Sequence, residues 1–190
     1  MGVIYMKILN FGSLNIDYVY SVDHFVQKGE TISSSQMNIF SGGKGLNQST
    51  ALGRAGAQVF HAGRIGKGGE FLVEQLKEAG VNTDLVVLDS QCSTGHAIIQ
   101  NDAEGDNCIL LYGGANQRIT KEQIDATLDQ FDAGDYLVLQ NETSNLPYLM
   151  EKAAEKQMKI VLNPSPMDEK IKALPLDKVT LFFVNEIEAA

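Results

Sequence analysis

The stretch KILNFGSLNID at residues 7–17 places a short apolar run directly before a loop of small and polar residues. Residues 7–11 have the length of a buried strand, and Gly12 ends it. Short apolar runs and amphipathic stretches of helical period alternate along the rest of the chain. Further strands are expected at 59–62, 85–88, 136–140, 160–163 and 181–184, and helices at 46–54, 69–79, 120–130 and 146–157. This order predicts an α/β fold, a doubly wound and mostly parallel sheet with helices on both faces.

Two segments, 18–40 and 95–112, depart from that order because their apolar and polar residues alternate. The second segment contains DAEGD at 102–106, which is typical of a turn between two strands. We therefore expect two antiparallel hairpins that form a small antiparallel β lid on a single domain covering residues 6–190. A half-exposed sheet of this kind is typical of a lid or of a contact between two chains.

The composition is that of a globular protein, with 190 residues, 44% of them hydrophobic, and a net charge of −9. The acidic balance disfavours a nucleic-acid partner, since phosphate binding depends on clustered lysine and arginine. Cys92 and Cys108 have neither metal-binding nor redox spacing, which favours a reduced protein of the cytoplasm. No apolar run is long enough to span a bilayer, so we expect no membrane partner.

Polar residues follow the first expected strand, at the strand end where ligands bind in doubly wound sheets. Asn15 and Asp17 are two residues apart, so on an extended segment their side chains project to the same side. A carboxylate beside an amide can accept and donate hydrogen bonds to the hydroxyl groups of a sugar. A turn or a cap is the structural alternative, and these two residues taken alone favour it.

The glycine cluster SGGKGLN at 41–47 leads into the helix expected at 46–54. Glycines allow a ligand to approach the backbone closely, and a helix N-terminus offers free N–H groups. The cluster is not a Walker A loop, because Lys44 is followed by Gly45 rather than by serine or threonine. It also lacks the GxGxxG pattern of dinucleotide sites. A plain loop before a helix is the alternative.

Carboxylates stand after two of the later strands. Glu142 follows the strand expected at 136–140, and Asn185, Glu186 and Glu188 follow the last apolar run. Carboxylates in the first turn of a helix are stabilised by the helix dipole. Carboxylates at a strand end can also position Mg²⁺ through water. Spacing alone leaves both interpretations open.

Seven segments taken together carry a resemblance to a known family. They are GSLNID (12–17), KGET (28–31), SGGKGLNQSTALGRAGA (41–57), STGHAII (93–99), GAN (114–116), NPSP (163–166) and NEIEA (185–189). In this order, and over essentially the whole chain, they resemble the ribokinase family of carbohydrate kinases, a branch of the phosphofructokinase-B type. The resemblance implies the ribokinase-like fold and an ATP-dependent transfer of phosphate to a primary hydroxyl of a pentose. D-ribose, converted to ribose 5-phosphate, is the substrate that the GAN and NPSP segments favour.

The resemblance also implies a role for each matching residue. Sugar binding is implied for Asn15, Asp17, Gly42, Gly43, Lys44, Gly45, Asn47 and Glu142. Asn185 matches an asparagine on the nucleotide side, and Glu188 matches a residue that organises Mg²⁺ and phosphate. The implied cofactors are ATP and Mg²⁺, with K⁺ as a compatible monovalent cation. The implied partners are a small sugar, ATP and a second copy of the chain across the lid.

The sequence departs from the family pattern at three places. Lys28 replaces the usual proline before Gly29, and Gly68 stands where an acidic residue is common. The later GAGD segment, with the anion hole, the catalytic base, the adenine site and the monovalent-cation site, has no counterpart before Ala190. We therefore expect a single truncated domain without the C-terminal nucleotide-binding part and without a catalytic residue, inactive as a kinase by itself. The alternatives are a non-catalytic sugar-binding or regulatory fragment and a related kinase for another sugar or a nucleoside.

Overall fold

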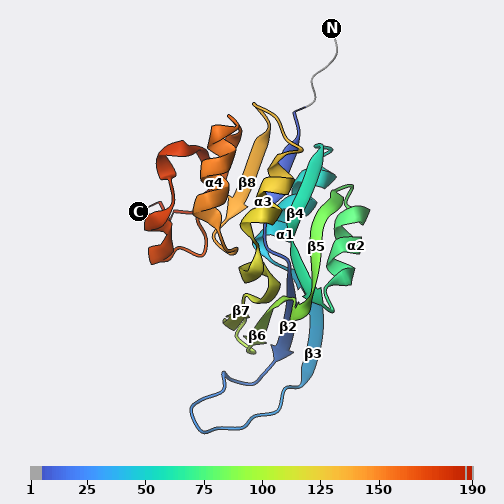
Figure 1. Cartoon of the computed structure of the whole chain (residues 1–190). Helices are drawn as coiled ribbons and strands as arrows, with labels where there is room; N and C mark the ends of the chain where they lie inside the picture. The colour runs from blue at the N-terminus through green and yellow to red at the C-terminus, as the bar shows by residue number, and fades with distance from the viewer. Residues whose placement is uncertain (1–5, 187, 190) are drawn as a thin grey trace.

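The computed structural model describes residues 6–186 and 188–189, which form an α/β body and a second, smaller sheet (Figure 1). The body contains a six-stranded sheet in the order β10-β9-β8-β1-β4-β5, and every neighbouring pair is parallel. Its strands are β1 (Ile8–Phe11), β4 (Val59–Lys67), β5 (Asn82–Ser93), β8 (Tyr136–Gln140), β9 (Lys159–Asn163) and β10 (Val179–Phe182). The predicted parallel sheet is confirmed.

Helices cover both faces of this sheet, as the sequence predicts. They are α1 (Lys44–Arg54), α2 (Glu70–Glu78), α3 (Lys121–Leu128) and α4 (Leu146–Glu155). The sheet therefore separates two apolar cores. Leu9 and Phe11 of β1 pack into the core beneath α3 and α4, and Ile8 of the same strand packs into the core beneath α1 and α2. Among the described residues, no helix combines the length and apolarity needed to cross a membrane.

The second sheet, here called the lid, has the order β3-β2-β6-β7. Its strands are β2 (Asn15–Ser21), β3 (Gln36–Gly42), β6 (Gly95–Asn101) and β7 (Asn107–Tyr112). The lid projects beyond one end of the body, away from the N-terminus (Figure 1).

The prediction of an antiparallel lid holds within each hairpin and is wrong for the sheet as a whole. The pairs β2–β3 and β6–β7 are antiparallel, but β2 and β6 pair in parallel. The reason lies in the body, because β2 continues from β1 and β6 continues from β5, and both body strands run in the same direction. The lid is therefore a mixed sheet of two hairpins joined side by side.

On the face of the body sheet that carries α1, an apolar surface over β8 to β10 is uncovered. A cavity of about 460 Å³ opens there between α1 and strands β8 to β10. It is lined mainly by apolar side chains, which include Ile8, Leu52, Tyr136, Val138, Val161, Leu181 and Phe183. Leu181, Phe182, Phe183 and Val184 are all exposed. The last strand also begins two residues earlier than predicted and ends at Phe182.

Candidate functional site

The loop between β1 and β2 packs directly against the start of α1. The backbone N–H of Leu46 donates to the carbonyl oxygen of Ser13 at 2.9 Å. A Cβ atom on Gly45 would lie 2.4 Å from the backbone nitrogen of Ser13, closer than any side chain tolerates. Glycine at this position is therefore required for the two loops to meet.

The carboxylate of Asp17 lies against the other end of the glycine cluster. A Cβ atom on Gly42 would stand 2.1 Å from Asp17 Oδ2, and the absence of a side chain at Gly42 leaves that space to the carboxylate. Gly43 follows with a φ of 93°, in the left-handed region, and is the N-cap of α1. The predicted loop glycines thus bring the first N–H groups of α1 next to β2.

Glu142, which follows β8, connects both loops. Its Oε2 accepts hydrogen bonds from the hydroxyl of Ser13 and, at 3.0 Å, from the backbone N–H of Lys44. Its Oε1 lies 3.6 Å from the ammonium group of Lys44, and the side chain is only 8% exposed. Glu142 therefore lies at the strand end where the sequence predicts it. Its carboxylate joins the β1–β2 loop to the glycine cluster at 41–47, here called the glycine loop.

Asn15 and Asp17 occupy one side of β2, as their spacing predicts. Asn15 is 4% exposed, and its Oδ1 accepts a hydrogen bond from Asn116 Nδ2 at 2.8 Å. Burial raises the pKa of Asp17 above its ordinary value, and the negative charge of nearby Glu142 raises it further. When a ligand donates hydrogen bonds to a half-buried carboxylate of this kind, it stabilises the ionised form that burial disfavours.

Asn47 lies on the first turns of α1 with its side chain exposed. Its backbone N–H donates to Gly43 at 3.1 Å, which continues the helix from the glycine loop. The structure therefore gathers the predicted residues Asn15, Asp17, Gly42, Gly43, Lys44, Gly45 and Glu142 around one point, and Asn47 stands on the helix that begins there.

Asn185 and Glu188 form a separate feature after β10. The N–H of Glu188 donates to Asn185 Oδ1 at 2.8 Å, and the N–H of Asn185 donates to Glu188 Oε2 at 3.2 Å. This reciprocal pair is a capping box, the arrangement that satisfies free N–H groups at the start of a helix. In the part of the chain that the structure describes, no three His, Cys, Asp or Glu residues are grouped as a metal site. The assignments of Asn185 to nucleotide and of Glu188 to Mg²⁺ stay predictions.

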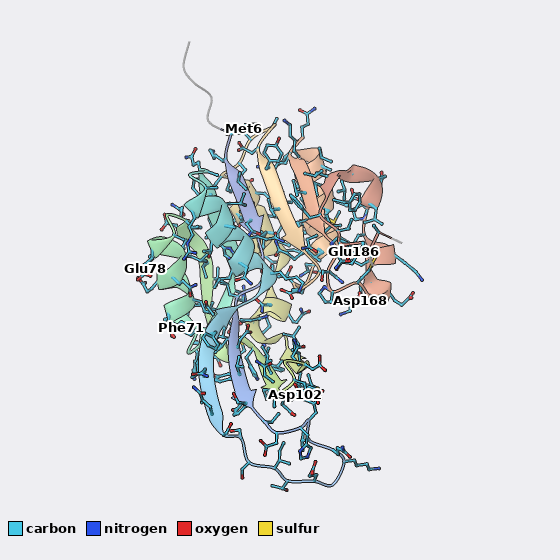
Figure 2. All side chains as sticks on the ribbon, turned by 180° about the vertical axis from the view of Figure 1, so that it is seen from behind. Met6, Phe71, Glu78, Asp102, Asp168 and Glu186 are labelled. Atoms are coloured by element: carbon cyan, nitrogen blue, oxygen red, sulfur yellow. The ribbon has the colours of Figure 1, made fainter. Side chains whose placement is uncertain are left out.

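A side-chain view from behind separates these regions (Figure 2). Asp102, at the turn of the β6–β7 hairpin, lies at the lid end, while Asp168 and Glu186 lie together at the side of β9 and β10. The residues predicted to bind sugar at the β1–β2 junction lie between the lid and the body, because β2 is itself a lid strand. Both predicted halves nevertheless follow carboxyl ends of the same parallel sheet, the sugar residues after β1 and β8, and Asn185 and Glu188 after β10.

A buried network of polar side chains links β1 to the first turns of α1, next to the glycine loop. Asn10 Nδ2 donates to the carbonyl oxygen of Gly45 and to the hydroxyl of Ser49, both at 2.8 Å. Ser49 in turn lies 2.7 Å from His61 Nδ1, and Gln140 Nε2 donates to Asn10 Oδ1 at 2.9 Å. Complete burial lowers the pKa of His61 to about 4, so the ring is neutral at neutral pH.

Sequence reasoning missed Ser13, Asn116 and this network. Ser13 and Asn116 lie in the GSLNID and GAN segments, which carried the family resemblance without a role for either side chain. Asn10 reads as one polar residue in an apolar strand, and that interruption was the only available signal.

The fold is a parallel α/β body with a polar cluster where the body meets the lid sheet. Comparison with known families places the chain more closely: residues 6–190 match the model of the pfkB family of carbohydrate kinases, and the chain belongs to that family. A curated relative, a ribokinase of Staphylococcus aureus, is 34% identical over 192 residues, which is 96% of this chain and 62% of the relative.

Solved structures agree with this placement. The ribokinase of Cryptococcus neoformans in complex with ADP is 35% identical, with a TM-score of 0.82 over 96% of this chain and 57% of that one. The ribokinase of Thermotoga maritima is 32% identical, with a TM-score of 0.82 over 97% of this chain and 61% of that one. The chain thus spans about three fifths of the length of these relatives.

Proposed function

We propose that the protein, at the full length of its relatives, transfers phosphate from ATP to the primary hydroxyl of a pentose. D-ribose is the substrate we favour, with ribose 5-phosphate as the product. The observation that carries this proposal is the half-buried carboxylate of Asp17 beside Gly42 and Asn15, next to the N-terminus of α1. The names of the relatives, ribokinases of bacteria and a fungus, support ribose as the acceptor.

Each residue around Asp17 has a chemical role in holding a sugar. Asp17 accepts hydrogen bonds from hydroxyl groups of the sugar, and the Nδ2 group of Asn15 donates a hydrogen bond to it. Lys44, paired with Glu142 at 3.6 Å, adds a positive charge to an otherwise acidic protein. Closure of the lid over such a site excludes water, which is the competing phosphate acceptor.

Phosphoryl transfer needs an aligned hydroxyl, neutralised phosphates and a group that takes the hydroxyl proton. The described residues around Asp17 would align the sugar hydroxyl. We assign the base, the anion hole and the adenine site to the part of the relatives' length that this chain does not span. We also propose that this part packs on the apolar cavity formed by Val138, Val161, Leu181 and Phe183, among others.

We propose Mg²⁺ as the metal that neutralises the phosphates of ATP. Kinases commonly hold this ion through one or two carboxylates together with the phosphates, so a dedicated cage of protein ligands is not needed. That requirement fits the described residues, where Glu186 and Glu188 both follow β10 and no acidic cluster surrounds them. A monovalent cation such as K⁺ and a cytoplasmic location stay predictions.

We propose that two copies of the protein meet through the lid. Within the lid segments, Phe40, Ile98 and Leu110 are exposed apolar side chains, whereas Val19 is partly buried. Further exposed apolar lid residues are Met37, Ile39, Ile109, Leu111 and Tyr112. An exposed apolar area of this extent on a small sheet favours association. Analytical ultracentrifugation at micromolar concentration tests it, and a strict monomer would contradict it.

The test of the proposed function is ADP release with ATP, Mg²⁺ and a panel of pentoses, hexoses and nucleosides. We expect ribose to give the highest kcat/KM in the protein at its natural length. The same assay on residues 1–190 alone should show no turnover, because general-base help contributes roughly 10²–10⁴-fold. Ribose binding without turnover at any chain length would instead support a non-catalytic sugar-binding protein, the second candidate.

A further inference from the structure

We propose that Asn116 is a positioning residue that fixes which way round the side-chain amide of Asn15 meets the sugar. Asn116 lies in the short helix η1 (Gly114–Arg118), between the last lid strand and α3. It is 1% exposed and does not reach the sugar site itself except through Asn15. This inference rests on the proposed sugar-binding function.

The backbone of Leu14 determines the orientation of the Asn116 amide. The N–H of Leu14, which can only donate, lies 3.0 Å from Asn116 Oδ1. The carbonyl oxygen of Leu14, which can only accept, lies 3.2 Å from Asn116 Nδ2. Oxygen and nitrogen of the Asn116 amide therefore cannot be exchanged without losing both hydrogen bonds.

Asn116 then transmits this orientation to Asn15. Its Nδ2 group donates a second hydrogen bond to Asn15 Oδ1 at 2.8 Å. Because the oxygen of Asn15 is engaged, the Nδ2 group of Asn15 is left for a ligand, and it makes no hydrogen bond to another described residue. Asn15 is thereby set as a donor, while Asp17, two residues on, can only accept when ionised.

Neighbouring residues keep Asn116 in place. Its backbone N–H donates to Gly113 at 3.0 Å, and its carbonyl oxygen accepts from the N–H of Ser144 at 3.1 Å. Gly95, the first residue of β6, provides the space for the contact. A Cβ atom there would lie 2.2 Å from Asn116 Nδ2 and 2.4 Å from Asn15 Oδ1. A side chain at Gly95 would thus push the two amides apart.

The consequence is a polarity requirement on one sugar hydroxyl, which must accept from Asn15. A deoxyfluoro sugar can accept a weak hydrogen bond at that carbon but cannot donate one, and the matching deoxy sugar can do neither. The unsubstituted protein should therefore bind the deoxyfluoro sugar about threefold more tightly than the deoxy sugar, the effect of a weak hydrogen bond. We expect this at one of the positions 2 and 3 of ribose.

The variant Asn116→Asp tests the mechanism by reversing the polarity. One carboxylate oxygen still accepts from the N–H of Leu14, and the other, which can no longer donate to the carbonyl oxygen of Leu14, now faces Asn15. The Asn15 amide is then stable only when its Nδ2 group donates to the new carboxylate, which turns Asn15 Oδ1 toward the sugar. The deoxyfluoro sugar should then bind more weakly than the deoxy sugar, because fluorine and Oδ1 repel each other.

The experiment is calorimetric titration of the protein at its natural length with ribose and with the 2- and 3-substituted deoxy and deoxyfluoro analogues. Asn145→Asp is the matched control, because Asn145 also donates from Nδ2 to a backbone oxygen, that of Ile119 at 2.7 Å, without contacting Asn15. Gly95→Ala is the second variant, since it separates the amides without adding a charge. It should abolish the preference, and it stands in if Asn116→Asp does not fold.

The outcomes separate this inference from the function on which it rests. Reversal in Asn116→Asp, or loss of the preference in Gly95→Ala, with an unchanged ratio in Asn145→Asp, would support the role of Asn116. Ribose binding with the same preference in all variants, or with no preference in the unsubstituted protein, would overturn that role alone. An unsubstituted protein that does not bind ribose would overturn the proposed function together with it.

Discussion

The carboxylate of Glu142 accepts a hydrogen bond of 3.0 Å from the backbone N–H of Lys44, which lies 98 residues earlier in the chain. The same oxygen also accepts from the hydroxyl of Ser13. One side chain at the end of β8 therefore joins the loop after β1 to the loop before α1. Those two loops carry the residues to which we assign the sugar, so the shape of the site depends on this contact.

Replacing Glu142 should loosen both loops. In Glu142→Ala the N–H of Lys44 and the hydroxyl of Ser13 lose their acceptor, and an unpaired buried donor costs about 1–3 kcal/mol. We expect the free energy of unfolding to fall by about that amount and ribose binding to weaken at least tenfold. Urea unfolding and calorimetry measure the two effects. Glu78→Ala, at an exposed end of α2, is the control and should change neither.

Gly45→Ala should be more damaging than its size suggests. The added methyl group would lie 2.4 Å from Ser13 N and 2.6 Å from Gly12 Cα, both backbone atoms that cannot turn aside. Moving the loops apart disrupts the contacts between α1 and β2, so we expect a loss of about 2 kcal/mol or more in the free energy of unfolding. Thermal unfolding checks this. Asn47→Ala, which shortens an exposed side chain two residues further along α1, is the control and should lose far less. Equal losses in the two variants would contradict the packing argument.

The buried imidazole of His61 should make stability depend on pH. Its pKa is lowered to about 4 in the fold by burial, from an ordinary value of 6.5, so the unfolded chain takes up the proton first. The stabilising contribution of neutral His61 is therefore complete above pH 6.5 and is lost as the pH falls toward 4. The slope should approach about 1 kcal/mol per pH unit in that window.

Denaturant unfolding from pH 7 to 4 measures this slope. His61→Gln should flatten it, since the variant has no group that titrates there. His24→Gln should leave it unchanged, because His24 is exposed in the loop between β2 and β3. A slope that persists in His61→Gln would show that carboxylates rather than His61 cause it.

The order of strands and helices was predictable because each element buries one continuous apolar face. β8, for example, is the run YLVLQ, in which four apolar residues precede Gln140, and it begins and ends as predicted. The mixed pairing of the lid was not predictable, since alternation within a strand does not say which strand lies beside it. The parallel pairing of β2 with β6 depends on the direction in which β1 and β5 leave the body.

The predicted sugar residues were found together because they stand at strand ends, which a parallel sheet brings to one edge. Asn116 was not found because its role depends on contacts with Leu14 and Asn15 across 102 and 101 residues of chain. For Asn185 and Glu188, the structure shows two reciprocal hydrogen bonds between the residues, and their assignment to nucleotide and Mg²⁺ stays a prediction.

The central claim is that Asp17 holds the sugar, and Asp17→Asn tests it most directly. The pKa of this acid is raised in the fold by burial and by Glu142, so its stabilising contribution is lost as the pH rises above 3.8. At neutral pH the ionised carboxylate is therefore a cost to the fold. Removing the charge should raise the free energy of unfolding while it weakens ribose binding.

The decisive measurement is the ribose dissociation constant of Asp17→Asn by calorimetry at pH 7, in the protein at its natural length. The control is Asp23→Asn, which removes an exposed carboxylate just after β2. Charge-assisted hydrogen bonds contribute about 1.5–3 kcal/mol each. We predict a dissociation constant at least tenfold higher in Asp17→Asn, together with a higher unfolding midpoint, and no change in the control. Unchanged ribose affinity in a folded Asp17→Asn variant would contradict the account.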